Sequence, residues 1–312
     1  MKLVVTIPAF NEEKTIGKVI EEIPKKISGI NKIEILVIDD GSTDSTSKIA
    51  KAKGARVIRN SSNKGLAFTF ARGLDAALGM GADIIVNTDA DFQYNQKQIP
   101  RLIKPILDKE ADIVLGSRFK GYIEDMSKQK YWGNKAMSFL VSFLTGLKIS
   151  DSQTGFRAFS REAALQINIF SDYTYTQETI LEAWEKQLLI KEVPADFRKR
   201  DGESRLISNI FIYAKRAGFT VIETYVSYKP LRVFLSVGAI LGLSGAFFGY
   251  KVLIHFLETG MVSPFIPSAI LSSMLLILGV QVMIMGLIAE MIKRNRKVQE
   301  RILTLQKKSR MN

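Results

Sequence analysis

Two aspartates separated by one residue, Asp89 and Asp91, follow directly behind an apolar segment that ends at Asn87. The segment, residues 82–87 (ADIIVN), predicts a buried β-strand, which would place both carboxylates at its C-terminal edge. Carboxylate oxygens are preferred ligands of Mg²⁺ and Mn²⁺, and Mg²⁺ commonly bridges one or two carboxylates to substrate phosphates. The pair therefore predicts a metal ion that holds a diphosphate. For the pair taken alone, the alternative is a solvated turn rich in aspartate.

The residue types that are missing from the chain narrow its chemistry. It has 312 residues, enough for one large α/β domain with an appendage, and no cysteine. Disulfides, thiolate nucleophiles and zinc–thiolate sites are therefore excluded. The single histidine, His255, lies in an apolar run, which argues against a histidine base or a histidine-rich metal site. Proton transfer would fall to carboxylates, lysine or tyrosine, or the reaction would need no base.

Strands and helices alternate over the first 120 residues, and this positions the aspartates. The expected strands are residues 2–7, 34–38, 55–59, 82–87 and 112–116. The expected helices are residues 11–23 with Asn11 as N-cap, a helix capped by Ser42 or Asp44 that ends near Lys53, residues 65–80 and residues 96–109. Such alternation predicts a parallel sheet with helices on both faces, whose ligands bind at the C-terminal strand ends. Three polar clusters fall there: residues 8–13, 39–42 and 89–93.

Two long uncharged stretches follow this α/β region. The first, residues 233–250, continues past Lys251 to Leu257, and the second covers residues 266–289. A membrane helix needs about 20 apolar residues, so both qualify. We expect a transmembrane hairpin over residues 231–292, with helices at about 233–257 and 266–290, although a pair of buried core helices is the alternative. Glycines on one face of the first helix could serve the hairpin itself or a homo-oligomer: Gly238, Gly242, Gly245 and Gly249.

The distribution of positive charge orients the hairpin and points to a partner. The net charge is +13, and residues 293–312 carry eight Lys or Arg against one acid, Glu300. A basic tail directly behind an apolar run favours anionic membrane lipids, and we expect no nucleic-acid partner. The connector 258–265 has no Lys or Arg, so the positive-inside rule places both termini and the N-terminal domain in the cytoplasm. The first apolar run, residues 3–7, is too short for a cleavable signal peptide. We expect an integral protein of a prokaryotic cell membrane.

Two further stretches have the composition of helices that lie on a membrane surface. Residues 131–147 are very apolar and begin with Tyr131 and Trp132, and residues 206–219 mix isoleucine and phenylalanine with basic residues. Aromatic side chains with a basic rim suit the membrane interface. Ordinary core helices are the alternative for each stretch.

Three motifs occur in a specific order: residues 8–13 (PAFNEE), residues 39–44 (DDGSTD) and residues 89–91 (DAD). Together they resemble glycosyltransferase family 2, whose members have the Rossmann-like, nucleotide-sugar-binding GT-A fold. The resemblance covers residues 1 to about 230, which would form the cytoplasmic transferase domain. In that family the first two motifs bind the nucleoside and the third holds the metal on the diphosphate.

Four further features resemble the polyprenyl-phosphate glycosyltransferases of the dolichyl-phosphate-mannose synthase type. Gln93 stands where these enzymes use a glutamine as a metal ligand, and residues 116–118 (GSR) and 151–157 (DSQTGFR) match two of their segments. Residues 200–205 (RDGESR) match a third segment, with Arg205 in place of the usual lysine. Arginine keeps the charge of lysine but changes its geometry.

The resemblance implies three groups of site residues. Contacts to the nucleotide sugar would come from Pro8, Ala9, Phe10, Asn11, Glu12, Ile38, Asp39, Asp40, Ser42, Lys64, Asp89, Ala90 and Asp91. The ligands of Mg²⁺ or Mn²⁺ would be Asp89, Asp91 and Gln93. Cations for the acceptor phosphate would be Arg118, Lys130, Lys135, Arg200 and Arg205, of which Arg118 and Arg200 would act in catalysis with Asp91. The planar fork of arginine matches phosphate oxygens.

The expected reaction is inverting transfer of one hexose to dolichyl or polyprenyl phosphate, giving a lipid-phosphate sugar donor for glycosylation. An ionised phosphate oxygen needs no general base, so the lack of a suitable histidine is no obstacle. Mannose from GDP-mannose is favoured only because mannosyl enzymes are the best-known relatives; glucose from a UDP-hexose and an N-acetylhexosamine are the alternatives, and the nucleoside is equally open. The alternatives are a processive polysaccharide synthase, a transferase acting on another lipid or lipid-linked sugar, and an inactive membrane scaffold or flippase subunit.

Overall fold

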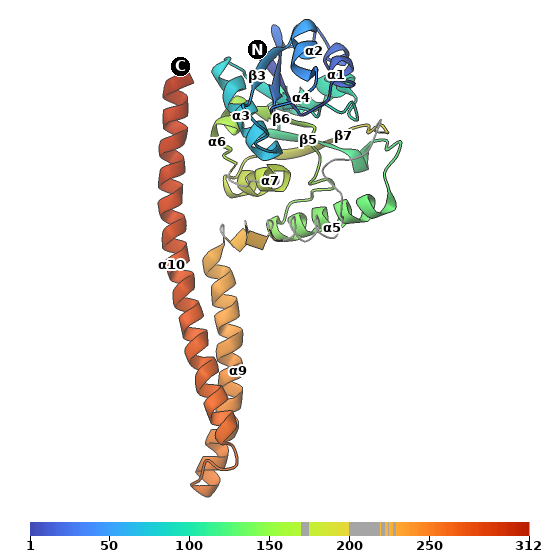
Figure 1. Ribbon diagram of the computed structural model, residues 1–312. Helices are drawn as coiled ribbons and strands as arrows, with labels where there is room; N and C mark the ends of the chain where they lie inside the picture. Colours follow the sequence, from blue (N-terminus) through green and yellow to red (C-terminus); the bar gives the residue numbers. More distant parts are fainter. Residues whose placement is uncertain (170–174, 200–218, 220–221, 224, 227–228, 312) are drawn as a thin grey trace. The chain divides into compact units, whose positions relative to one another are not determined.

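The computed structural model describes residues 1–169, 175–199 and 229–311, together with residues 219, 222, 223, 225 and 226 (Figure 1). The chain divides into two compact units. One comprises Met1–Ile222 with Leu303–Asn312, and the other comprises Glu223–Ile302. Most of the stretch 206–219, expected as an interfacial helix, lies outside the described residues, as do Arg200 and Arg205.

The first unit is built around a seven-stranded sheet in the order β3-β2-β1-β4-β6-β5-β7. Its strands are β1 (Lys2–Ala9), β2 (Lys32–Asp39), β3 (Arg56–Arg59), β4 (Ile84–Asn87), β5 (Ile113–Ser117), β6 (Arg157–Ser160) and β7 (Ile190–Pro194). The neighbours β3, β2, β1 and β4 run parallel, as does the pair β5 and β7. The five strands predicted from the alternating pattern are all present.

One strand departs from the predicted parallel arrangement. β6 lies between β4 and β5 and runs antiparallel to both, with Asn87 opposite Arg157. The parallel sheet is therefore a mixed one. The chain beyond the C-terminal edge of β4 consequently runs beside the segment that leads into β6.

Helices cover both faces of the sheet (Figure 1). They are α1 (Ile16–Glu22), α2 (Thr46–Ala52), α3 (Leu66–Gly79), α4 (Ile99–Leu107), α5 (Lys128–Thr145), α6 (Arg161–Gln166) and α7 (Tyr175–Glu185), with short 3₁₀ turns η1 (Gln96–Gln98) and η2 (Arg118–Lys120). α1 and α4 bury apolar side chains against the odd-numbered residues of β1. α3 packs on the other face. Its Gly73 lies close to Ile38 and to Thr6, an even-numbered residue of β1 whose side chain points to the face opposite the odd-numbered ones.

The first helix begins later than the sequence predicted. Asn11, the expected N-cap, has a left-handed backbone with φ of 54°, and α1 starts at Ile16. The backbone N–H of Asn11 donates to Ser42 Oγ at 2.9 Å, and that of Glu12 donates to Thr46 Oγ1 at 2.8 Å. Side chains of the second motif and of the first residue of α2 thus bind the amides of the first motif and hold it as a loop.

The second unit contains two apolar helices, α9 (Pro230–Thr259) and α10 as far as Ile302; α10 as a whole covers Ile266–Met311. Both are long and apolar enough to span a membrane. α10 continues through residues 293–311, so this part of the expected basic tail is helical, and its place in the cytoplasm stays a prediction. A Cβ on Gly238 would lie 2.6 Å from Met283 Cγ, and one on Gly249 would lie 2.6 Å from Ser272 Oγ. These two glycines therefore let α9 and α10 approach each other.

Candidate active site

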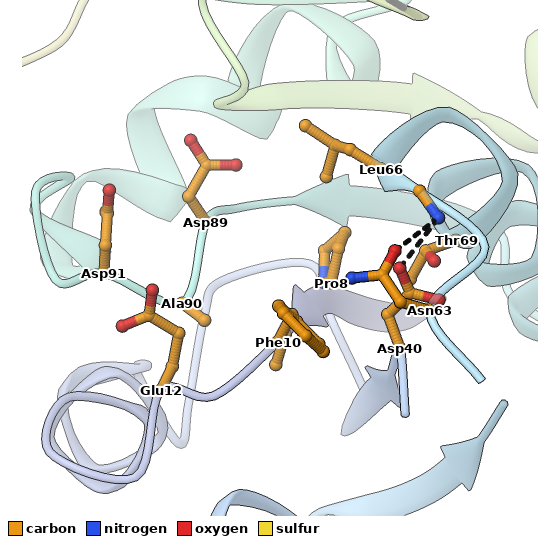
Figure 2. Close-up of a pocket in the computed structure, with 12 residues that line it drawn as sticks. Pro8, Phe10, Glu12, Asp40, Asn63, Leu66, Thr69, Asp89, Ala90 and Asp91 are labelled. Carbon is orange, nitrogen blue, oxygen red and sulfur yellow. Dashed lines mark hydrogen bonds between the residues drawn. The ribbon is translucent and has the colours of Figure 1, made fainter. Parts of the chain in front are cut away.

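A cavity of about 240 Å³ lies at the C-terminal ends of β1, β2 and β4 (Figure 2). Residues from all three predicted clusters line it. The lining residues are Pro8, Ala9, Phe10, Glu12, Asp40, Asn63, Gly65, Leu66, Thr69, Asp89, Ala90 and Asp91. The convergence that was expected at this edge of the sheet is therefore confirmed.

One end of the cavity is acidic (Figure 2). Asp89, Asp91 and Glu12 lie there, and Asp91 Oδ1 accepts the backbone N–H of Gln93 at 3.2 Å. Phe92, which lies between Asp91 and Gln93 in the sequence, has a left-handed backbone with φ of 61°, so the chain turns tightly after Asp91. Glu12 Oε2 accepts the hydroxyl of Thr15 at 2.9 Å.

The acidic end fits a hard divalent cation that shares its ligands with a substrate. Two carboxylates of one loop face the same cavity, and oxygen ligands suit Mg²⁺ and Mn²⁺. Among the described residues, no three His, Cys, Asp or Glu side chains gather closely enough to hold a metal by themselves. Water molecules or substrate oxygens would complete the coordination.

Gln93, the third expected ligand, lies beside this end but is not a lining residue. Its side-chain Nε2 donates to the backbone carbonyl of Arg198 at 3.3 Å. Arg198 in turn forms a two-pronged ion pair with Glu22, with N–O distances of 2.9 and 2.7 Å. Its guanidinium stands 4.5 Å from the centre of the Phe92 ring. The hydrogen bond from Gln93 Nε2 to the Arg198 carbonyl orients the side-chain amide of Gln93, and Oε1 is the atom through which Gln93 would bind a metal.

The opposite end of the cavity is organised by Asp40 (Figure 2). Asp40 is buried, and its two oxygens accept the backbone N–H groups of Lys64 and Gly65, each at 2.9 Å. The amide of Asn60 donates to it at 2.7 Å. Asp40 thus holds the loop before α3 against the cavity.

That loop and the start of α3 contribute lining residues that were not predicted from the sequence. Lys64 was the predicted contact in this loop, whereas its neighbours Asn63 and Gly65, with Leu66 and Thr69, line the cavity. The motif Asn63-Lys64-Gly65 ahead of a predicted helix was the available signal. It did not show which side chains of the loop turn inward.

Five of the expected nucleotide contacts do not line the cavity: Asn11, Ile38, Asp39, Ser42 and Lys64. Ile38 is a core residue, and Asp39 is buried, where it accepts the N–H of Ser42 at 2.7 Å and the hydroxyl of Ser47. Asn11 Oδ1 accepts the N–H of Thr43 at 2.8 Å. The hydrogen bonds of Asp39 and Asn11 therefore stabilise the backbone of the first two motifs outside the cavity.

Arg118 lies in a buried ion pair. Its Nε and Nη2 donate to the two carboxylate oxygens of Asp151 at 2.7 and 2.8 Å, and Arg118 is only 7% exposed. Burial alone would lower the pKa of Arg118, but the charge of Asp151 outweighs it and the pKa is raised. Asp151 therefore occupies the Nε and Nη2 donors of Arg118. Arg118 would have to change its conformation to bind an acceptor phosphate through the same two donors.

The two lysines expected at the acceptor phosphate belong to α5. Lys130 lies in the first turn, where its backbone N–H donates to the Ser127 cap at 3.4 Å. The ammonium of Lys135 stands 4.2 Å from the centre of the Phe119 ring and 5.9 Å from that of Tyr131. Their role toward a phosphate stays a prediction, as do those of Arg200 and Arg205.

Comparison with known proteins agrees with this architecture. Residues 4–167, more than half of the chain, match the family described as Glycosyl transferase family 2. The UDP-N-acetylglucosamine–dolichyl-phosphate N-acetylglucosaminyltransferase of Methanococcus voltae is 34% identical over 213 residues, covering 60% of this chain and 82% of that protein. The dolichyl-phosphate hexose transferase of Haloferax volcanii is 33% identical over 205 residues, covering 65% and 86%.

Among solved structures, glucosyl-3-phosphoglycerate synthase from Mycobacterium tuberculosis, in complex with Mn²⁺, UDP and glucosyl-3-phosphoglycerate, has a similar fold. The TM-score is 0.55 at 24% identity, and the match covers 73% of this chain and 79% of that one. The sheet order and this structural match show the Rossmann-like GT-A fold. The chain belongs to glycosyltransferase family 2.

Proposed function

We propose that this protein transfers one sugar from a nucleotide sugar to the phosphate of dolichyl phosphate or a related polyprenyl phosphate, with inversion at the anomeric carbon. The observation that carries the proposal is the two-ended cavity. Asp89 and Asp91 stand at one end and the Asp40-anchored loop at the other. A nucleoside diphosphate has the matching polarity, with an anionic part that needs a cation and a base that needs an apolar slot.

The apolar part of the cavity supports a nucleoside at the Asp40 end. Pro8, Phe10 and Leu66 line it between the two polar ends (Figure 2). Phe10 lines the cavity and is 36% exposed, and an aromatic ring at this place would pack against a base or ribose. The names of both reported relatives specify dolichyl phosphate, one with N-acetylglucosamine and the other with a hexose. We therefore propose a hexose or an N-acetylhexosamine, and mannose stays a prediction.

The bond changes are those of a direct displacement. An ionised phosphate oxygen of the acceptor forms the new bond to the anomeric carbon. The bond from that carbon to the diphosphate oxygen breaks, and its electron pair leaves with the nucleoside diphosphate. A divalent cation, when bound, supplies positive charge for this leaving group. Asp89, Asp91 and Gln93 are proposed to hold it, and no protein base is required.

The lipid acceptor requires that the reaction occur at a membrane, and α5 supports this. Its buried side is formed by Met137, Ser138, Val141 and Thr145. The other side presents aromatic side chains that are 69% (Trp132), 72% (Phe139) and 75% (Phe143) exposed. Three residues at spacings of seven and four form one apolar stripe on the helix. We propose that this stripe enters the membrane interface.

The hairpin would anchor the domain beside its acceptor. α9 and α10 are proposed as the two spans, with residues 1–230 and the basic end of α10 on the cytoplasmic side. The basic residues 293–312 would contact anionic headgroups. A scaffold without activity would have no need for the acidic pair and the anchored loop in one cavity.

A variant of the acidic pair tests the proposal. Asp91→Asn keeps the size of the side chain but removes its charge. Transfer of labelled sugar to dolichyl phosphate in proteoliposomes should fall more than about a hundredfold, since losing even a partner behind a metal ligand costs 10–100-fold. Asp108→Asn, at an exposed surface pair with Lys104, is the matched control and should keep full activity. Wild-type activity in Asp91→Asn would contradict the proposal.

A further inference from the structure

The carboxylate of Asp89 lies against a backbone that has no side chain. A Cβ built on Gly155 would stand 2.7 Å from Asp89 Oδ1, 2.8 Å from Oδ2 and 3.0 Å from Cγ. Real Cβ atoms do not approach other atoms so closely, so only glycine leaves Asp89 in this position. The nearest atoms include both carboxylate oxygens, so a side chain at position 155 would displace the whole carboxylate group.

The antiparallel strand β6 explains why these two residues meet. Asn87 pairs with Arg157 at the end of β4, and continuing the same register by two residues brings Asp89 opposite Gly155. The segments after β4 and before β6 are far apart in sequence, but the antiparallel pairing of β4 with β6 brings them side by side.

The peptide groups of Gly155 are held on both sides. Its N–H donates to Tyr94 Oη at 3.0 Å, and its carbonyl accepts from Asn87 Nδ2 at 2.9 Å. Tyr94 is 2% exposed and Asn87 is fully buried. Thr6 Oγ1 donates to Asn87 Oδ1 at 3.3 Å, which orients the amide.

Arg157 secures the turn that leads into Gly155. Its guanidinium donates to the carbonyls of Thr154 at 2.8 Å, Ser152 at 3.0 Å and Thr176 at 2.7 Å. Arg157 is fully buried, and burial lowers its pKa to about 10, so it stays charged at neutral pH. Three charge-assisted bonds to backbone carbonyls make the turn rigid.

We infer that Gly155, Tyr94 and Asn87 are positioning residues for the metal-binding carboxylate of Asp89. Gly155 leaves the space that the carboxylate occupies, and Tyr94 and Asn87 hold the Gly155 backbone in place, so the site for the carboxylate exists before a cation arrives. The inference rests on the proposed metal role of Asp89. Groups behind a metal ligand typically change metal affinity 10–100-fold when they are removed.

Binding of Mn²⁺ alone to the purified full-length protein, measured from the loss of the free-Mn²⁺ electron paramagnetic resonance signal, tests the inference without any reaction. Gly155→Ala should raise the dissociation constant for Mn²⁺ by about 10–100-fold. Tyr94→Phe removes the hydroxyl that accepts the Gly155 N–H and that also forms a hydrogen bond with Thr154 Oγ1 at 3.3 Å, and should weaken Mn²⁺ binding by a smaller factor of about 3–10. It serves as the second variant if Gly155→Ala does not fold.

Two controls separate the possible outcomes. Gly73→Ala crowds only the core residue Ile38, at 3.1 Å, and should bind Mn²⁺ like the wild type even if its melting temperature changes. Asp89→Asn should lose Mn²⁺ binding; if it does not, the proposed metal role itself is wrong. If Asp89→Asn loses binding while Gly155→Ala and Tyr94→Phe stay within twofold of the wild type, the positioning inference is overturned.

Discussion

Arg118 and Asp151 form a buried, two-pronged ion pair in which the backbone N–H of Arg118 donates a third hydrogen bond, at 3.0 Å, to the same carboxylate. Burial alone would raise the pKa of Asp151, but the charge and hydrogen bonds of Arg118 outweigh it and hold that pKa below its ordinary value. The pair joins the end of β5 to the segment before β6.

Replacement of Asp151 should therefore cost stability. Asp151→Asn leaves the buried charge of Arg118 without its partner, and we expect the free energy of unfolding at pH 7 to fall by about 3–5 kcal/mol. The exposed pair of Lys104 and Asp108 gives a control, because Asp108→Asn should change stability by less than about 1 kcal/mol. Denaturant unfolding of the full-length protein in detergent measures both. An effect of Asp151→Asn as small as that of the control would contradict this assignment.

The same pair predicts a pH dependence with a definite sign. Because the pKa of Asp151 is lowered by folding, its contribution is complete above the unfolded value of about 3.9 and is lost as pH falls through the lower folded value. The stability difference between the wild type and Asp151→Asn should be constant from pH 7 to about 5 and shrink below about pH 4. A difference that grows on acidification would contradict the sign.

Asp40 should control nucleotide binding more than metal binding. In Asp40→Asn only one oxygen remains for three donors, the N–H groups of Lys64 and Gly65 and the amide of Asn60, and of the two N–H groups Gly65 has a second acceptor, Asn63 Oδ1 at 3.0 Å. An unsatisfied buried donor costs about 1–3 kcal/mol, so we expect the affinity for UDP or GDP to fall about tenfold or more. Calorimetric titration with each nucleotide measures this. Unchanged affinity for whichever nucleotide the wild type binds would show that the loop does not depend on Asp40.

The aromatic stripe of α5 can be located by fluorescence. The chain has two tryptophans, Trp132 and Trp184, so Trp184→Phe leaves Trp132 as the single reporter. In proteoliposomes we expect lipids brominated near the headgroup end of the acyl chain to quench Trp132, because an interfacial helix buries its apolar face about 5–10 Å deep. Quenching by aqueous iodide should be weak. Strong quenching by iodide with none by brominated lipid would place the stripe in water.

Two glycines of α9 should respond differently to the same substitution. In Gly238→Ala the new methyl would meet Met283 Cγ at 2.6 Å and the carbonyl oxygen of Gly279 at 2.8 Å, whereas in Gly242→Ala it would meet nothing within 4 Å. Overpacking costs about 1–3 kcal/mol, so Gly238→Ala should lower the melting temperature of the hairpin in detergent and Gly242→Ala should not. Equal effects of the two substitutions would show that the helices do not pack as described.

The sequence predicted the sheet wherever a strand was an uninterrupted apolar run, as in β1, β2 and β4. It missed β6 and β7. Arg157–Ser160 is short, begins with a buried arginine and is inserted antiparallel by tertiary pairing, and Ile190–Pro194 is short and contains Lys191 and Glu192. Likewise, the motif around Asp39 and Asp40 showed that carboxylates lie at a strand end, but not that Asp40 faces the cavity while Asp39 binds Ser42 behind it. Adjacent residues of one strand point to opposite sides, and only the packed structure decides which side becomes the site.

The position of Gly155 beside Asp89 could not be predicted from the sequence either. Residues 151–157 were noticed for their resemblance to a family segment, but nothing in their composition shows that Gly155 comes to lie behind a carboxylate 66 positions earlier in the chain. That relationship follows from the register of β4 and β6, which depends on long-range pairing.

The most direct test of the central claim is sugar transfer by the purified full-length protein to dolichyl phosphate. UDP-N-acetylglucosamine, UDP-glucose and GDP-mannose would be offered separately as labelled donors, each with Mn²⁺ or with EDTA. We predict a chloroform-soluble labelled product with one donor, formed with Mn²⁺ and abolished by EDTA. Folded protein that binds a nucleoside diphosphate with Mn²⁺ but forms no lipid-linked product from any of the three donors would contradict the proposed reaction.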